Sequence, residues 1–154
     1  MSRAFVHESD EEPEQIPERP VSERPNLVTP EGMRQIEARL RELESERHAA
    51  KSADDAPSLA RIERDLRYFN RRRAAAQLIE PQPDPHSVRF GVRVRLKRED
   101  GGEITYRLVG EDEAEPARGL LSWASPLAQS LLGKEVGDTV TFQDAELEIA
   151  DIES

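Results

Sequence analysis

Apolar residues in the first half of the chain recur at a helical spacing in two stretches. The spacing is three, four and three residues in each: Met33, Ile36, Leu40 and Leu43, then Leu59, Ile62, Leu66 and Phe69. Apolar positions at this spacing lie on one face of a helix and form the seam of a coiled coil. A short polar stretch at residues 52–58 separates the two patterns. The pattern therefore predicts an antiparallel helical hairpin over residues 29–80.

The residues at both ends of this hairpin agree with the prediction. Thr29 is a natural N-cap, Pro30 takes the first helical position, and Glu31 favours the positive end of a helix. The three prolines of residues 81–86 stop the second helix and form a linker.

After the linker the apolar period changes to two, which indicates half-buried strands. The alternating positions are Val88, Phe90, Val92, Val94 and Leu96, and then, after a turn at Asp100-Gly101-Gly102, Ile104, Tyr106 and Leu108. Further apolar runs predict strands at Leu120–Trp123, Val140–Phe142 and Leu147–Ile152. Ser125, Pro126 and Gly133 are typical of the cap, first residue and end of a helix between them. The predicted fold is α+β: a helical hairpin followed, over residues 87–154, by a small antiparallel sheet with one helix.

Residues 1–28 have a different composition. They contain seven acids and three arginines, with several prolines and few large apolar side chains. Such a segment buries too little to offset the entropy of ordering, so we expect an acidic, disordered tail. Ala4-Phe5-Val6 is a small apolar island within it, either a frayed end or a docking motif.

Composition and charge narrow the possible partners. The 154-residue chain has 35% charged residues, no cysteine and a net charge of −10, and no apolar run approaches the length needed to cross a bilayer. We therefore expect a cytoplasmic protein without a membrane partner. Six arginines nevertheless crowd into residues 58–79, against Glu63 and Asp65. An acidic chain with one arginine-rich helix suits a protein partner, and leaves one basic strip for nucleic acid.

The residues that could carry out catalysis or bind metals do not form a recognisable catalytic or metal-binding motif. His7, His48 and His86 fall in the tail, a helix and the linker, and share no ligand spacing. Ser125 lies at a helix cap rather than in a nucleophile motif. Trp123 is either a core residue or an aromatic residue that binds a ligand. We therefore expect neither an enzyme nor a bound cofactor or metal.

Residues 26–152 contain a series of short sequence motifs. In the second domain they are Phe90-Gly91, Tyr106-Arg-Leu-Val-Gly110, Asp112-Glu-Ala114, Ser125-Pro126-Leu-Ala128, Leu132-Gly-Lys134 and Gly137-Asp138. In the hairpin they are Asn26-Leu-Val-Thr-Pro30-Glu-Gly32, Arg67-Tyr68 and Leu78-Ile79. In these motifs the chain resembles the Gre family of bacterial transcription elongation factors, GreA and GreB.

The resemblance implies both a fold and a function. The second domain would be FKBP-like, and would dock on bacterial RNA polymerase while the hairpin enters the secondary channel. By resemblance, docking would lie in the loop 111–118, which we expect to be the most acidic exposed stretch of the domain, and in the segment 120–126. The candidate docking residues are Asp112, Glu113, Ser122, Ser125 and Pro126. Acids at the hairpin tip would help the polymerase hold a catalytic Mg²⁺ that cuts backtracked RNA.

The tip departs from the family pattern, whose signature is of the type Gly-Asp-x-x-Glu-Asn. The tip acids here are the adjacent pair Asp54 and Asp55. Each arm is roughly ten residues shorter than in the family, which removes about 15 Å of reach. Either the pair assists the polymerase's metal, or one acid caps the second helix and both only solvate the turn. We expect weak or absent stimulation of cleavage.

Arg64, Arg67 and Arg71 share one face of the second helix, at spacings of three and four. They could contact nascent RNA or an acidic channel wall, or form a solvated face balanced by acids on the first helix. Two other functions stay open for the whole chain. One is a Rnk-like regulator that binds the polymerase without cleavage activity, and the other is an FKBP-like prolyl isomerase.

Overall fold

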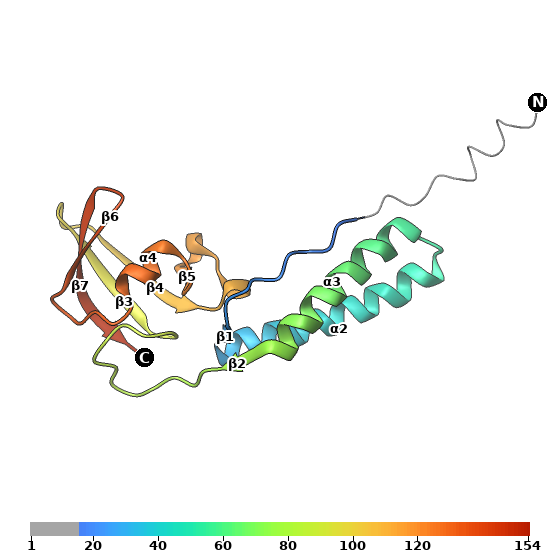
Figure 1. The fold of residues 1–154 in the computed structure, drawn as a ribbon, viewed down its shortest axis with the longest axis horizontal. Coiled ribbons are helices and arrows are strands. Elements are labelled where there is room, and N and C mark those ends of the chain that lie inside the picture. The colour runs from blue at the N-terminus through green and yellow to red at the C-terminus, as the bar shows by residue number, and fades with distance from the viewer. Residues whose placement is uncertain (1–15) are drawn as a thin grey trace, which may run out of the picture.

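The computed structural model describes residues 16–154, and Figure 1 shows a helical hairpin that projects from a sheet domain. The first part of the chain consists of β1 (Asn26–Val28), α2 (Pro30–Ser52), α3 (Ala56–Ala75) and β2 (Ala76–Leu78). The second part consists of β3 (Arg93–Arg98), β4 (Glu103–Val109), the 3-10 turns η1 (Glu111–Glu113) and η2 (Pro116–Arg118), β5 (Leu120–Ser122), α4 (Pro126–Leu131), β6 (Thr139–Phe142) and β7 (Ala145–Glu153). No helix among residues 16–154 is long and apolar enough to cross a membrane. The segment Ala4-Phe5-Val6 lies outside the described residues.

The two long helices form the predicted antiparallel hairpin. Helix α2 begins at Pro30, and the Thr29 side chain accepts a hydrogen bond from the Gly32 amide, as the cap prediction requires. The predicted seam forms the hairpin's own core, in which Ile36, Leu43 and Leu66 are buried. The hairpin is therefore held by its apolar seam, as the heptad spacing predicts.

The open end of the hairpin contains a short parallel sheet that the sequence analysis missed. Strand β1, just before α2, pairs with β2, just after α3, in the register Asn26 to Ala76 and Val28 to Leu78. The prediction of disorder up to residue 28 is therefore wrong for β1. The prediction that the second helix continues to residue 80 is wrong for β2. Helix packing brings the two three-residue strands together, and neither has a periodicity of its own.

The second domain is a five-stranded sheet in the order β5-β4-β3-β7-β6. The pairs β3–β4, β3–β7 and β6–β7 are antiparallel, whereas β4 and β5 run parallel. The prediction of a purely antiparallel sheet is therefore wrong at β5. The parallel direction arises because η1 and η2 carry the chain back along the sheet before β5 begins.

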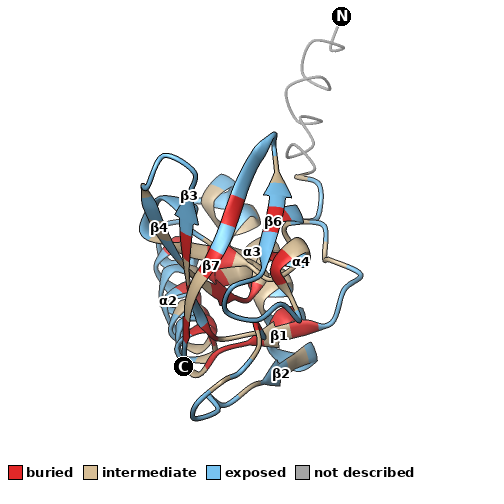
Figure 2. Cartoon of the chain, turned by 90° about the vertical axis from the view of Figure 1, so that its left-hand side faces the viewer, coloured by how far each residue is buried: buried red, intermediate tan, exposed pale blue. Residues whose placement is uncertain are grey.

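Alternating positions of the central strands point into the core of this domain. In Figure 2 buried segments interrupt exposed ones along β3 and β7. Val94, Leu96 and Ile149 are fully buried, and they pack with Ala128 and Leu131 of helix α4. All the buried residues of this cluster lie between Val88 and Ile152, so the sheet domain has a core separate from that of the hairpin.

The first strand of this sheet begins later than its apolar alternation predicts. Val88 and Val92 are buried, but regular pairing starts only at Arg93. Between them Gly91 has φ +89°, a left-handed conformation that interrupts an extended strand. Val88 instead exchanges backbone hydrogen bonds with the turn after α4, through Gly133 and Lys134.

Candidate functional site

The hairpin tip is an exposed three-residue turn, Ala53 to Asp55. Asp55 is the N-cap of α3, and its side chain accepts a hydrogen bond from the Ser58 amide at 3.3 Å. Hydrogen bonding to Ser58 lowers the pKa of Asp55, which stays ionised and exposed. Asp54 takes a left-handed conformation with φ +52° and is also exposed. The tip thus presents two carboxylates, of which one also holds the start of α3, as the capping alternative predicts.

No further acid or histidine joins this pair. Within residues 16–154 no group of three or more His, Asp or Glu side chains could hold a metal ion. Of the three histidines, His48 and His86 are exposed on α2 and in the linker, and His7 lies outside the described residues. A metal at the tip would therefore need ligands from a partner.

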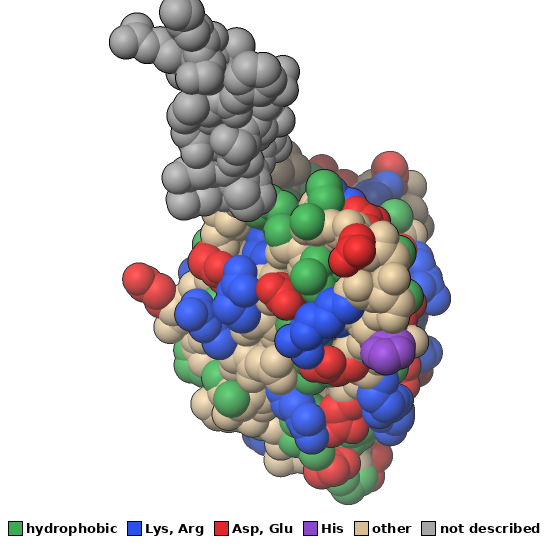
Figure 3. All heavy atoms as spheres, turned by 90° about the vertical axis from the view of Figure 1, so that its right-hand side faces the viewer, with side chains coloured by type: hydrophobic (Ala, Val, Ile, Leu, Met, Phe, Trp, Pro, Cys, Tyr) green, Lys and Arg blue, Asp and Glu red, His purple; other side chains and the backbone are tan. Residues whose placement is uncertain are grey.

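The three predicted arginines of α3 differ in their surroundings. Arg67 is paired with Glu18 of the preceding segment, at 2.9 Å between Nε and Oε1. Arg64 contacts its neighbour Asp65 at 3.2 Å, whereas Arg71 is exposed. Neither Arg64 nor Arg67 is paired with an acid of α2, so the alternative of a face balanced by the first helix does not hold for these two. Seen from the tip end, cationic and anionic side chains are interspersed (Figure 3).

Two of the four acids in the predicted docking loop, Asp112 and Glu113, are turned inward, whereas Glu115 is exposed. Asp112 lies on η1, and its side chain is 14% exposed because it faces the hairpin. Its Oδ2 accepts a hydrogen bond from Arg72 Nε at 2.6 Å, and the Tyr68 hydroxyl donates to its Oδ1. The prediction that this loop is the most acidic exposed stretch of the domain is wrong for Asp112. The acid is turned inward because a buried cation compensates its charge.

Glu113 is buried against the start of α2. Its carboxylate accepts hydrogen bonds from the Thr29 amide at 3.2 Å and the Gly110 amide at 2.9 Å, and from the Thr29 hydroxyl. It lies so close to Gly32 that a Cβ there would be 2.2 Å from Glu113 Cδ. A carboxylate at a helix N-terminus interacts favourably with the helix dipole. The expected exposure is therefore wrong for Glu113 as well, which joins the two domains.

The remaining docking candidates lie at the start of α4. Ser125 caps this helix as predicted: its Oγ accepts from the Ala128 amide at 3.3 Å and donates to the Ser122 carbonyl at 2.7 Å. Ser122 Oγ accepts from the Ala124 amide at 3.2 Å. Pro126 is exposed beside them. The two serines therefore shape this turn, and Pro126 presents an apolar surface to a partner.

Arg72 is the centre of the joint between the domains, and the sequence analysis did not single it out. It is 1% exposed, and besides Asp112 it donates to Asn26 Oδ1 at 2.6 Å and reaches Glu111 Oε2 at 3.5 Å. The Asn26 side chain in turn donates to the Arg72 carbonyl at 2.7 Å. One side chain thus ties β1, α3 and η1 together. The seam spacing gave no signal for it, because the three-four-three pattern continues from Phe69 to Arg73, which is exposed.

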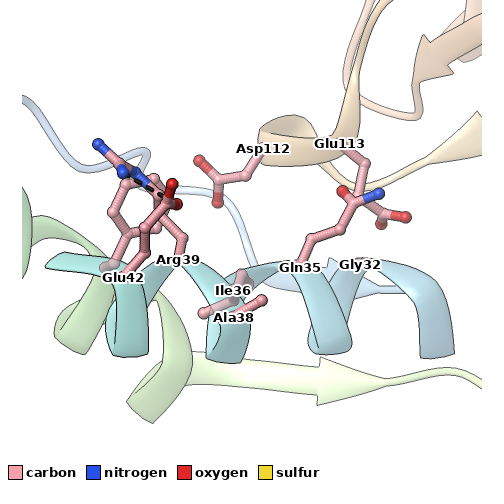
Figure 4. Close-up of a pocket in the computed structure, with 9 residues that line it drawn as sticks. Gly32, Gln35, Ile36, Ala38, Arg39, Glu42, Asp112 and Glu113 are labelled. Carbon is pink, nitrogen blue, oxygen red and sulfur yellow. Dashed lines mark hydrogen bonds and ion pairs between the residues drawn. The ribbon is translucent and has the colours of Figure 1, made fainter. Parts of the chain in front are cut away.

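A cavity of about 340 Å³ lies beside this joint, between α2 and η1. In Figure 4 Asp112 and Glu113 hang from η1 towards α2, above Gly32, Gln35 and Ile36. Arg39 at its far side is held by Glu42, at 3.1 Å. The cavity is lined by engaged carboxylates and apolar groups, and its lining residues include no nucleophile with an adjacent base.

Two comparisons with known sequences agree with this architecture. Residues 82–154 match the family described as transcription elongation factor, GreA/GreB, C-terminal domain. GreA of Helicobacter pylori is 36% identical over 136 residues, which cover 84% of this chain and 79% of that protein. GreA of a Nitratiruptor species is 40% identical over 123 residues, covering 79% and 72% of the two chains. The chain belongs to the GreA/GreB family.

Solved structures of related factors are similar at a lower level. The structure of GreA factor homolog 1 from Thermus thermophilus has 20% sequence identity and a TM-score of 0.43, covering 85% of this chain and all of that one. A GreA/GreB factor from Nitrosomonas europaea has 19% identity and a TM-score of 0.43, covering 84% and 99%.

The aromatic residues of the sheet domain lie in different surroundings. Tyr106 and Phe142 pack against the core of the sheet domain, and Phe90 lines a separate small cavity with Leu27 and Ile79. Trp123 is half-buried, and its indole N–H has no hydrogen-bond partner among the described residues. These four aromatic residues of the GreA/GreB family member thus do not line one common cavity.

Proposed function

We propose that this chain binds bacterial RNA polymerase through its sheet domain, inserts its hairpin into the secondary channel, and regulates elongation without being an enzyme. The observation that carries the proposal is the buried joint around Arg72, which fixes the hairpin to the sheet domain. A hairpin fixed in this way converts docking of one domain into a defined position for the tip. Membership of the GreA/GreB family supports the choice of partner. Acting on this partner, the protein works in the cytoplasm.

The dimensions of the hairpin favour occupation of the channel over cleavage. Helix α2 has 23 residues, which corresponds to about 34 Å. A carboxylate must come within about 2.1 Å of Mg²⁺ to bind it. With arms shorter than the family pattern, Asp54 and Asp55 stop short of the polymerase's catalytic metal. The protein then acts as a competitor that displaces cleavage factors or impedes backtracking.

Two surfaces make the contacts in this proposal. Pro126 and the turn before α4 meet the polymerase, because Pro126 is exposed and the residues of the turn are only partly buried. The arginine face of α3, with Arg64, Arg67 and Arg71, meets nascent RNA in the channel. Guanidinium groups donate paired hydrogen bonds to phosphate, which suits them to this contact.

The first experiment measures association with core RNA polymerase by pull-down at micromolar protein. We expect a complex, and expect that a Pro126→Glu variant, which places a charge on the exposed turn, weakens it. A Pro83→Glu variant, in the exposed linker and outside the predicted docking region, is the matched control. Absence of any complex contradicts the proposal. If both variants weaken polymerase binding equally, Pro126 is not part of the docking surface.

The second experiment adds the protein and Mg²⁺ to a stalled, backtracked elongation complex. We expect no acceleration of RNA shortening, together with displacement of an authentic GreA factor. Rapid shortening that is lost in the double variant Asp54→Ala, Asp55→Ala would show instead that the tip reaches the metal.

A further inference from the structure

The segment before β1 lies along helix α3 (Figure 1), and we call its described residues, Ile16–Pro25, the N-terminal strap. Arg19 holds the strap in place. Its guanidinium lies 4.0 Å from the centre of the Tyr68 ring and 5.2 Å from that of Phe69, and contacts Asp65 at 3.3 Å. Stacking of a guanidinium on an aromatic face adds to the ion pair.

The strap is also attached to the joint between the domains. Ser22 Oγ donates a hydrogen bond to Glu111 Oε1 at 3.0 Å, and Tyr68, under Arg19, donates to Asp112. The strap therefore has a defined path from β1 towards the tip. The expected disorder is wrong for this segment too, because it packs on residues that only the folded hairpin and η1 bring together.

Anchoring of Arg19 places Glu18 on the arginine face. The Glu18 carboxylate accepts hydrogen bonds from Arg67 Nε and from a terminal nitrogen of the same guanidinium, at 2.9 and 2.5 Å. Arg67, Arg71 and Arg64 all lower the pKa of Glu18, with the Arg67 hydrogen bond the largest cause. The cationic field of the face thus converges on this one carboxylate.

We propose that the strap is an internal competitor of RNA, in which Glu18 occupies the guanidinium of Arg67 that would otherwise bind a phosphate. The inference rests on the RNA contact under Proposed function. A carboxylate and a phosphate take the same two parallel hydrogen bonds from a guanidinium, so only one of them occupies it at a time. Both side chains of the pair are 50% exposed, and exposed ion pairs are weak, so RNA can displace the strap.

The test is binding of a fluorescently labelled single-stranded RNA oligonucleotide to the full-length protein, measured by anisotropy at low ionic strength. The decisive variant is Arg19→Ala, which removes a positive charge and also the anchor. We expect it to bind RNA about two- to fivefold more tightly, because the loss of a weak exposed ion pair releases Arg67. Arg24→Ala, which removes a positive charge from an exposed strap position, is the control and should weaken binding slightly or leave it unchanged.

A second pair of variants tests the competing carboxylate. Glu18→Gln should raise RNA affinity by a similar factor and by more than Glu42→Gln, which makes the same change of charge on exposed α2. Arg67→Gln should weaken binding, and adding Glu18→Gln to it should bring no gain. Far-UV circular dichroism checks that each variant keeps its helices.

Three outcomes overturn the proposal. If Arg19→Ala weakens binding as Arg24→Ala does, or if both glutamine variants act alike, the strap does not compete with RNA. If Arg67→Gln weakens binding but no strap variant strengthens it, the RNA contact stands and only the competition falls. If neither the protein nor any variant binds RNA, the RNA contact falls as well, and association with polymerase is judged by the pull-down alone.

Discussion

The two ends of the hairpin use the same residue types in opposite ways. At the tip, Asp54 and Asp55 are exposed, and one of them caps a helix. At the open end, Asp112 is partly buried against a cation and Glu113 is buried against backbone amides. A charged side chain stays buried only where a partner compensates it. At the open end the charges are thus compensated within the fold, whereas at the tip they stay exposed to solvent.

The contrast is sharpest within three consecutive arginines of α3. Arg72 is 1% exposed and bridges β1 to η1, whereas Arg71 and Arg73 are exposed. Successive side chains of a helix point in different directions, so the middle arginine faces the joint while its two neighbours face outwards. The following predictions test whether the joint and the tip differ energetically as this geometry requires.

The largest effect is expected for Arg72→Met. It leaves Asp112 and Glu111 facing an apolar group, and removal of one partner of a buried ion pair costs about 3 kcal/mol or more. Urea denaturation followed by the helical circular dichroism signal measures it. Arg73→Met is the matched control on the next residue, and should change stability by about 0.5 kcal/mol or less. Similar losses in both variants would contradict a special role for Arg72.

Gly32→Ala is expected to destabilise the protein by about 1–3 kcal/mol, the usual cost of forcing atoms into a filled space. The added Cβ would lie 2.2 Å from Glu113 Cδ. Alanine at a helical position otherwise stabilises by about 1 kcal/mol relative to glycine. In a Glu113→Ala background the same substitution should therefore become stabilising. Destabilisation of equal size in both backgrounds would show that the close approach to Glu113 is not the cause.

Tyr68→Phe is expected to cost about 1.5 kcal/mol at neutral pH, because it removes a hydrogen bond to the Asp112 carboxylate. The pH dependence gives a sharper test. Burial, and then Asp112, raise the pKa of Tyr68 to about 12. In the unfolded chain a tyrosine ionises at about pH 10. The Tyr68 hydroxyl therefore contributes its full stabilisation below that pH.

The unfolded state then loses its proton first as the pH rises, and stability falls until the folded pKa is passed. The difference between the wild type and Tyr68→Phe should therefore shrink above pH 10, roughly where free tyrosine ionises. Tyr106→Phe, in the sheet domain, serves as the control. Parallel stability curves for the wild type and Tyr68→Phe at alkaline pH would contradict this account.

The smallest effect is expected at the tip. Asp55→Ala removes the cap of α3 and should cost about 1 kcal/mol. Asp55→Asn keeps a capping oxygen and should cost much less, since asparagine is an equally good cap. The thermal midpoint of the helical signal measures both. If asparagine destabilises as much as alanine, the negative charge rather than the hydrogen bond holds the helix start.

Local patterns predicted the elements of this protein well. The seam spacing predicted the hairpin, Thr29 and Ser125 predicted two helix starts, and Gly133 predicted the left-handed end of α4. These features depend on neighbours within a few residues along the chain. The same local information predicted the tip turn and the exposed Asp54 and Asp55, because a turn between two helices points away from both cores.

Contacts between distant segments decided the rest. A sequence of three arginines does not show that Arg72 turns inward to Asn26 and Asp112, because these partners are about 40 residues or more away. The parallel pairing of β1 with β2, the inward turn of Glu113 and the seat of Arg19 on Tyr68 have the same origin. The sequence by itself determined the family, the hairpin and its caps, through local spacing and ordered motifs. Which charges are buried in the joint and which stay available to a partner was decided only by the tertiary structure, because burial depends on what the fold places opposite each side chain.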